Sequence, residues 1–412
     1  MAVSKIDKGL ELPLEGAASK FWSVVGDDLI REIFYRLPRY RFVIRCGIVC
    51  KRWYSVINSN FDELVFQNHN RKHKPSSSDD HSSSGYFSSC TLFLSLNKID
   101  RPLYLLFLDK SNTSSSISTT TFLNFVPWPE HDLVIQSSLE DLLLVSRKCN
   151  PTSFCVCNPL TKRWIALPEA PNDRPRRGLV RDDQNRFRVV LLDIKFDGCH
   201  DVYYATIFSS ETGKWNESSY NLPPLMVPEI FGLIHGPYNQ SQGVSTTNGG
   251  GRVHWLRARD IIEFSSYVER GPRLFVLPEE FGNEQDVRLK SCLGVVRGQL
   301  RLLEIFKRGF GFVLKVWELN YESGEWNLVH HRVKWVASMF KMLALHPADG
   351  DEIFMLRDHD IWIYNIREDT YKRLGEFPKI PDEEIGSTYL NGIFTLTHPL
   401  CPTSLFALPP SH

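Results

Sequence analysis

The pattern of apolar and polar residues divides the chain into a short helical segment and a long segment of strands. The apolar residues Leu29, Ile30, Ile33, Phe34 and Leu37 share one helical face until Pro38, and Gly26-Asp27-Asp28 places a capping carboxylate ahead of them. A second series repeats the helical period and comprises Phe42, Cys46, Val49, Cys50, Trp53 and Ile57. From residue 91 onward the alternation is that of β-strands. We therefore predict a small all-α segment followed by a large all-β domain.

A hairpin is repeated along the β segment. In FCVCNPLTKRWIALP, residues 154–168, Phe154 and Val156 fall on one strand face and Cys155 and Cys157 on the other, ahead of a turn. A polar residue six positions before an aromatic anchor recurs in four copies, which are Asn158 and Trp164, Ser209 and Trp215, Asn320 and Trp326, and Asn365 and Tyr371. The anchors are 51, 111 and 45 residues apart, so a degenerate copy without its anchor is expected near 260–278. A second marker has a similar step and comprises Gly251, Gly298, Gly350 and Gly392.

This period, with several short strands per unit, is typical of a β-propeller. The first blade is expected from TLFLSL, PLYLLFL and TFLNFV, and the later units at about 139–168, 187–220, 251–278, 298–330 and 350–377. NGIFTLTHPL near the C-terminus is expected to pair with the first blade and close the ring. At about 50 residues per blade the domain holds six or seven blades, and the complete marker sets favour six. The alternative architecture is a two-sheet sandwich with repeated hairpins.

Composition narrows the class of protein. The 412 residues include 48 Lys plus Arg and 48 Asp plus Glu, so the balanced charge indicates no nucleic-acid or membrane partner. The first residues mix charges and predict no signal peptide, and no later run is apolar enough to span a bilayer. Nine cysteines without a framework spacing predict reduced thiols in an intracellular protein, cytoplasmic or nuclear.

The helical segment resembles an F-box. The family's usual form is Leu-Pro-Asp-Asp/Glu-Leu-hydrophobic-x-Glu-Ile-Leu-x-Arg-Leu-Pro, followed after a gap by Val-Cys-Lys-x-Trp. VVGDDLIREIFYRLP and VCKRW, beginning at residues 24 and 49, match it, with Val25-Gly26 in place of Leu-Pro and Phe34 in place of Leu. The resemblance implies docking on a Skp-type adaptor of a cullin ubiquitin ligase. It implies that the adaptor-binding residues are Val25, Leu29, Ile30, Ile33, Phe34, Leu37, Pro38, Val49, Cys50 and Trp53.

The whole chain resembles plant-type F-box proteins with a C-terminal kelch-like or F-box-associated repeat domain. CNPLTKRWIALP, GRVHWL, LKVWELNYESGEW and IWIYNIREDTYKRL are similar to that domain's recurring segments, although the kelch double glycine is not visible. The expected organisation is a disordered N-terminus (1–19), an F-box (20–68), a Ser-rich linker (69–85) and the propeller (86–412). The resemblance implies a non-catalytic substrate receptor that needs no cofactor. The alternatives are that the helices only pack on the propeller, or that the propeller holds its own small-molecule site as a ligand sensor or kelch-oxidase-like enzyme.

Candidate chemistry is sparse in the sequence. No nucleophile-elbow or phosphate-binding motif is present, and the Cys155 and Cys157 pair is expected to be sheet packing rather than half of a metal site. The segment 171–186 is longer than a blade connection requires, and its arginines could hold an acidic or phosphorylated substrate. These candidates are Arg174, Arg176, Arg177 and Arg181. The alternative is a solvated loop balanced by Asp173, Asp182 and Asp183.

Overall fold

The computed structural model describes two compact units, Met1–Ser83 and Ser84–His412. The described residues are 25–37, 46, 51–59, 89–96, 104–109, 117–118, 123–181, 186–196, 201–222, 243–246, 251–257, 260–267, 271–278, 287–308, 311–334, 341–347, 349–357, 360–376, 390–397, 403, 405 and 408. The predicted N-terminal segment 1–19 and linker 69–85 lie outside them. Within this part of the chain, no helix is long and apolar enough to cross a membrane.

The first unit contains two described helices, α2 (Asp27–Arg36) and α4 (Lys51–Ser59). Both are amphipathic, as the spacing of their apolar residues predicts. The prediction of a capping carboxylate is wrong, because Gly26 is the N-cap residue of α2 and no side chain caps this helix. Asp27 lies instead in the first turn, where a carboxylate interacts favourably with the helix dipole, and pairs with Arg52 of α4 at 2.7 Å.

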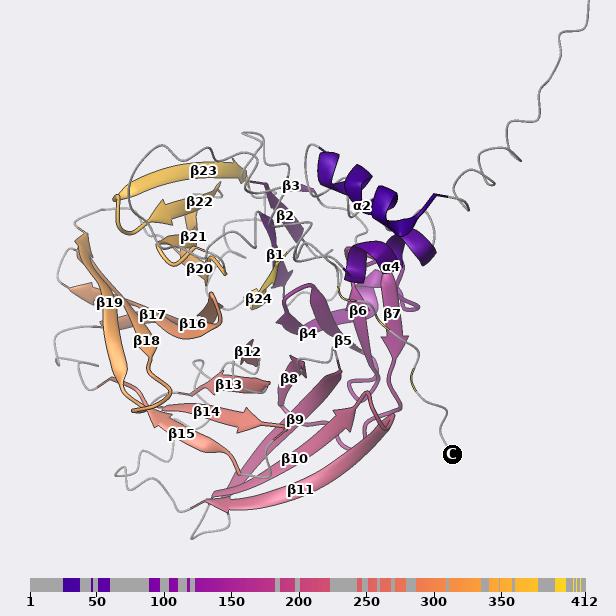
Figure 1. The fold of residues 1–412 in the computed structure, drawn as a ribbon. Coiled ribbons are helices and arrows are strands. Elements are labelled where there is room, and N and C mark those ends of the chain that lie inside the picture. The colour runs from indigo at the N-terminus through magenta and orange to yellow at the C-terminus, as the bar shows by residue number, and fades with distance from the viewer. Residues whose placement is uncertain are drawn as a thin grey trace, which may run out of the picture. The chain divides into compact units, whose positions relative to one another are not determined.

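The second unit consists of strands, which fall into antiparallel groups of four that we call blades and number along the chain (Figure 1). Blade 1 contains β24 (Leu390–Thr397), β1 (Ser89–Leu96), β2 (Tyr104–Asp109) and β3 (Ile117–Ser118). A short 3-10 helix, η1 (Glu130–Asp132), leads into blade 2, which contains β4 (Leu133–Leu139), β5 (Leu142–Arg147), β6 (Phe154–Asn158) and β7 (Arg163–Ala166). Blade 3 contains β8 (Arg176–Arg181), β9 (Phe187–Phe196), β10 (Asp201–Ser209) and β11 (Lys214–Leu222).

The remaining described strands form three further groups. Blade 4 contains β12 (Val244–Thr246), β13 (Arg252–Leu256), β14 (Asp260–Ser265) and β15 (Arg273–Val276). Blade 5 contains β16 (Val287–Val296), β17 (Gln299–Arg308), β18 (Gly311–Leu319) and β19 (Trp326–Lys334). Blade 6 contains β20 (Lys341–Leu345), β21 (Glu352–Arg357), β22 (Asp360–Asn365) and β23 (Thr370–Glu376). The blade count of the whole domain stays a prediction of the sequence.

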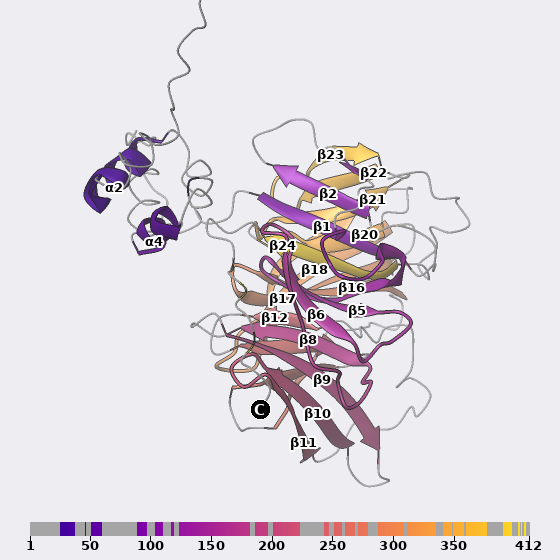
Figure 2. The same ribbon diagram turned by 90° about the vertical axis from the view of Figure 1, so that its right-hand side faces the viewer.

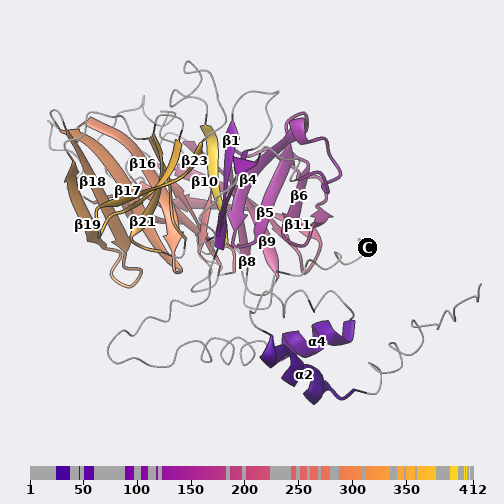
Figure 3. The same ribbon diagram turned by 90° about the horizontal axis from the view of Figure 1, so that it is seen from above.

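The first-named strand of each blade is the innermost, and it contacts the innermost strand of the next blade around the ring (Figure 1). A parallel bridge between Val244 and Ser138 also joins β12 to β4. Seen from the side and from above, the strands run between the two faces of the ring (Figures 2 and 3). This is the arrangement of a β-propeller.

Ring closure follows the sequence prediction. The C-terminal strand β24 pairs antiparallel with β1, with Phe93 opposite Phe394. The prediction of a strand at TFLNFV is wrong, because Leu123 and Val126 lie in a turn. Both residues are buried against Phe394 and Leu396. The short strand β3 completes blade 1 instead. Pairing the first and last strands of this unit closes the ring and removes the free edges that an open stack of sheets would expose.

The recurring polar residue of the hairpin forms the turn between the third and fourth strands. Asn158 Oδ1 accepts the amide of Leu160 at 2.9 Å, and Asn320 Oδ1 accepts that of Glu322 at 2.9 Å. Four positions after the polar residue the backbone has a positive φ in all four copies, at Lys162 (55°), Gly213 (68°), Gly324 (74°) and Asp369 (59°). The repeat recognised in the sequence is therefore one backbone geometry.

The aromatic anchor joins neighbouring blades. Trp215 Nε1 donates to the carbonyl of Pro168 at 2.8 Å, just beyond the outermost strand of blade 2. Trp326 Nε1 donates in the same way to Val276 of blade 4 at 3.0 Å. The second marker holds only in part, because Gly251, Gly298 and Gly350 precede the second strand of a blade whereas Gly392 lies within the innermost strand β24.

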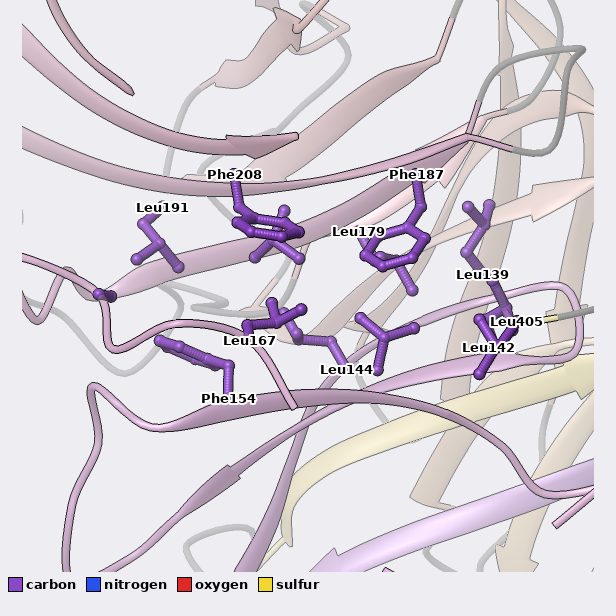
Figure 4. Packing of buried hydrophobic residues seen from close by; sticks show 13 residues of the cluster. Leu139, Leu142, Leu144, Phe154, Leu167, Leu179, Phe187, Leu191, Phe208 and Leu405 are labelled. Carbon is purple, nitrogen blue, oxygen red and sulfur yellow. The ribbon is translucent and has the colours of Figure 1, made fainter. Parts of the chain in front are cut away.

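Strand β6 shows how the alternation fills the core. Phe154 and Val156 enter the apolar cluster between blades 2 and 3, whereas Cys155 and Cys157 enter a second cluster toward blade 1. In the first cluster, leucines of blade 2 face Leu179, Phe187 and Phe208 of blade 3 (Figure 4). Leu405, beyond the closing strand, lies in the same cluster and is 8% exposed. Leu405 therefore anchors this part of the chain in the junction.

Candidate functional site

The helical unit is held together by one side of α2. Ile30 and Phe34 are fully buried against Val56 and Ile57 of α4. Phe34 also meets Trp53 edge to face, with ring centroids 5.4 Å apart. Phe34 stands where the F-box motif usually has leucine. It keeps the interior of the unit apolar and adds an aromatic contact.

The other side of α2 presents apolar residues at the surface of the unit. Leu29 is 54% exposed, and Ile33 is half-buried. Leu37 and Trp53 are also half-buried and pack at the margin of the core. Sequence reasoning missed Tyr54 of α4, which is 47% exposed and directly follows the tryptophan of the motif.

These positions divide the residues predicted to bind an adaptor. Val25, Ile30 and Phe34 are buried in the core of the helical unit, in one cluster with Val56 and Ile57 of α4. Their contact with an adaptor stays a prediction. Leu29, Ile33, Leu37 and Trp53 reach the surface. Pro38, Val49 and Cys50 lie outside the described residues. Periodicity identifies which residues share a helix face, but it does not say which edge of that face another helix covers.

The four arginines predicted to bind substrate do not lie on a free loop. Residues 176–181 form β8, the innermost strand of blade 3, so the long loop predicted over 171–186 is wrong. Arg174 is 9% exposed and donates to Thr206 Oγ1 at 2.7 Å and to Glu217 Oε1 at 3.2 Å. This side chain is part of the blade's own packing.

Two more of these arginines connect blade 3 to its surroundings. Arg177 donates to Gln136 Oε1 of β4 at 2.9 Å and pairs with Asp173 at 2.5 Å. Arg181 donates to Glu140 and to Thr403 of the C-terminal tail. Both guanidinium groups already have partners, so substrate would have to compete with them. Arg176 differs, because its side chain makes no hydrogen bond and no ion pair with the described residues.

Catalytic chemistry has little support in the geometry. Cys90 Sγ lies 3.5 Å from His346 Nε2. The amide of Asp349 donates to His346 Nδ1 at 2.9 Å, so Nδ1 is the acceptor and the neutral ring carries its proton on Nε2. That tautomer cannot take a proton from the thiol, which argues against activation of Cys90 as a nucleophile.

The described residues contain no cluster of metal-binding side chains. No group of three or more His, Cys, Asp and Glu side chains in that part of the chain is placed to hold a metal ion. Cys155 and Cys157 are fully buried free thiols. Their mutual hydrogen bond, together with burial, raises the pKa of Cys157 well above its usual value, so the protonated thiol is favoured.

Comparison with known proteins matches both units. The model of the F-box domain matches residues 22–61. The family described as F-box protein At3g26010-like, beta-propeller, matches residues 108–391, which is more than half of the chain. No curated protein matches the sequence.

A solved structure of an oligogalacturonate lyase in complex with manganese is similar at 10% identity and a TM-score of 0.39, covering 68% of this chain and 73% of that one. A likeness this distant says nothing about chemistry. The two family matches, in contrast, agree with the helical pair and the ring of blades described above. The chain belongs to the family of F-box proteins with an At3g26010-like β-propeller.

Proposed function

We propose that this protein is the substrate-recognition subunit of a Skp-cullin-F-box ubiquitin ligase. In this role the F-box docks on a Skp-type adaptor, and the propeller holds a protein substrate while other subunits perform the ubiquitin chemistry. The proposal implies a location in the cytoplasm, the nucleus or both. The observation that carries it is the presence of an F-box and an F-box-associated type of propeller in one chain.

The exposed side of α2 supports the docking step. Leu29 is an apolar residue of the F-box match that the helical unit leaves 54% exposed. Burying a leucine in an interface contributes about 2 kcal/mol. An aspartate at the same position would lose that contribution and add the cost of an unpaired carboxylate. Leu29 is therefore the position at which docking can be weakened without opening the core formed by Ile30 and Phe34.

Affinity purification from cells tests the proposal. Full-length wild type, Leu29→Asp and a matched control are expressed with the same tag, and the co-purified adaptor and cullin are quantified. The control is Val276→Asp, because Val276 on β15 is 55% exposed and lies in the propeller. We expect wild type and Val276→Asp to retain both partners and Leu29→Asp to lose them. Equal recovery of the adaptor with all three proteins would sink the proposal.

A further inference from the structure

Strand register places Arg176 at one end of the junction between blades 3 and 4. Arg176 begins β8 and lies opposite Leu192 on β9. Residues opposite each other in an antiparallel ladder project to the same face of the sheet. Leu192 belongs to the apolar cluster that joins blade 3 to Trp255 and Ile262 of blade 4. Arg176 therefore lies on the face of blade 3 that meets blade 4, at the end where β8 begins.

The turn between β13 and β14 brings a second guanidinium to the same end. The amide of Arg257 donates to the carbonyl of Asp260 at 2.8 Å, and its Nη2 donates to Asp260 Oδ2 at 2.6 Å. The side chains of Arg257 and Asp260 are 18% and 9% exposed. Since Arg257 follows Trp255 by two positions, it continues the row of side chains that faces blade 3. Arg257 is thus paired, and its partner Asp260 is occupied.

A buried hydroxyl without a partner completes the cluster. Tyr203 of β10 is fully buried, and its Oη makes no hydrogen bond in the described part of the protein. Burial raises the pKa of Tyr203 to about 12, with Arg257, Asp201, Asp260 and Arg176 close enough to influence it. The hydroxyl therefore remains a donor at neutral pH. Leaving a buried donor without an acceptor costs free energy, so an acceptor placed beside this hydroxyl would be favoured.

The carboxylates near Arg176 do not compensate for the burial of its charge. Burial, and next the neighbouring Arg257, hold the pKa of the Arg176 guanidinium below its usual value, although Asp193 and Asp260 act in the opposite direction. Asp260 is engaged by Arg257, and Asp193 Oδ1 accepts the amide of Ile194 at 2.8 Å. The nearby carboxylates thus do not offset the burial of this cation. An added anion would do so.

We propose that Arg176 and Tyr203 form an anion-binding subsite that receives one acidic side chain of the substrate protein, its carboxylate or phosphate group. Arg176 supplies a forked donor that fits either oxyanion, and Tyr203 supplies a further hydroxyl donor. This subsite rests on the proposed function and deepens it, because it assigns the kind of group that the propeller recognises.

Capped amino acids serve as probes of the subsite. N-acetyl-phosphoserine methylamide, N-acetyl-glutamate methylamide and the uncharged N-acetyl-glutamine methylamide are added separately to the full-length protein. Binding is measured by saturation-transfer NMR on each probe. A signal from the phosphoserine probe alone supports a phosphorylated substrate, and a signal from both acidic probes supports an acidic one. A glutamine signal as strong as theirs, or no signal from any probe, overturns the subsite.

Three variants locate the binding. Arg176→Met is expected to reduce the acidic-probe signal at least tenfold, whereas Arg163→Met, at an exposed position on β7, keeps it. Tyr203→Phe is expected to be as stable as wild type or more stable, because it removes an unpaired hydroxyl, and yet to weaken probe binding. Full probe binding by both Arg176→Met and Tyr203→Phe overturns the subsite. Adaptor co-purification with the same variants reports separately on the ligase role, so failure of one conclusion is distinguishable from failure of the other.

Discussion

At the scale of single residues, the hairpin repeat rests on one unusual backbone position. The residue four places after the recurring polar turn residue has a positive φ whether it is Gly213, Gly324, Lys162 or Asp369. Glycine adopts this conformation without steric cost, whereas in other residues it lowers the stability of the fold by roughly 1–2 kcal/mol. The blades with Lys162 and Asp369 therefore tolerate local strain that the blades with glycine avoid.

Substitution at this position should change stability in opposite directions. Gly324→Ala meets no close atom, since Phe275 lies 3.9 Å from the position of the added Cβ, so its cost of about 1 kcal/mol comes from the backbone alone. Lys162→Gly should raise the free energy of unfolding by about 0.5 kcal/mol, because relieved strain exceeds the entropy lost by glycine. Urea denaturation measures both, with Glu322→Ala in the same turn as the control. Unchanged stability in Gly324→Ala would contradict this explanation of the repeat.

A buried carboxylate beside a histidine gives blade 4 a pH dependence. Glu263 Oε2 lies 3.1 Å from His254 Nε2, and both side chains are almost fully buried. Burial raises the pKa of Glu263, but the bond to His254 and the charges of Arg252 and Arg273 outweigh it and bring the pKa below its usual value. A depressed carboxyl pKa stabilises the fold above the unfolded value of about 4.3, and the stabilisation is lost as pH falls through the folded value.

Glu263→Gln should therefore destabilise the protein mainly at neutral pH. We expect a loss of about 1–3 kcal/mol at pH 7, since His254 loses a charged partner. The difference from wild type should narrow as pH falls below the unfolded value of about 4.3 and on through the lower pKa of Glu263 in the folded protein, where this carboxylate takes up a proton. Denaturation curves at pH 7 and at successively lower pH values, with the exposed Glu325→Gln as a control, measure this. A difference that stays constant with pH would show that the charge of Glu263 is unimportant.

At the scale of elements, the outer hairpins were predictable, and the innermost strands other than β24 were not. The third and fourth strands carry an Asn or Ser turn and an aromatic anchor, both of which act locally. In contrast, β12 has three residues and β8 is RRGLVR, with too few alternating apolar positions to identify a strand. These strands form because their neighbours on both sides supply hydrogen bonds and partners for Arg177 and Arg181, which no local pattern records. The sequence pattern alone therefore predicts a loop for the segment that contains these arginines.

The C-terminal tail adds a second closure beyond β24. Asp141 is fully buried and accepts the amide of Thr403 at 2.5 Å and its hydroxyl at 2.6 Å. Asn158 Nδ2 donates to the same carboxylate at 2.7 Å. Together with Leu405 in the core between blades 2 and 3, these bonds fasten the tail to blade 2. The pattern of strands alone did not predict this contact.

Two truncations separate the tail from the closing strand. A chain ending at His398 keeps β24 and loses Thr403 and Leu405, which leaves Asp141 without two donors. We expect it to fold with a free energy of unfolding lower by about 3 kcal/mol or more. A chain ending at Tyr389 also loses β24, exposes the edge of β1 and should aggregate. Size-exclusion chromatography and urea denaturation distinguish the two, and a monomeric, stable chain ending at Tyr389 would contradict closure by β24.

At the scale of the whole molecule, the chain combines an F-box with a β-propeller. The F-box motif was recognisable in the sequence because a short helix pair can form a core only if its apolar residues recur at helical spacing. Which of its apolar residues are buried within the unit was less predictable, since burial of Ile30 and Phe34 depends on how α4 lies across α2. On the propeller, the sequence grouped four arginines that the fold separates into three paired side chains and Arg176. Packing between elements, which the sequence does not display, decides both cases.

Direct titration of a purified Skp-type adaptor into the purified full-length chain tests the central claim. Calorimetry should show one-to-one binding for wild type and the same affinity for Val276→Asp. Leu29→Asp should bind at least roughly thirtyfold more weakly, which corresponds to the loss of about 2 kcal/mol from one buried leucine. Absence of binding by wild type, or equal affinity of Leu29→Asp and wild type, would contradict the assignment of this protein as an F-box substrate receptor.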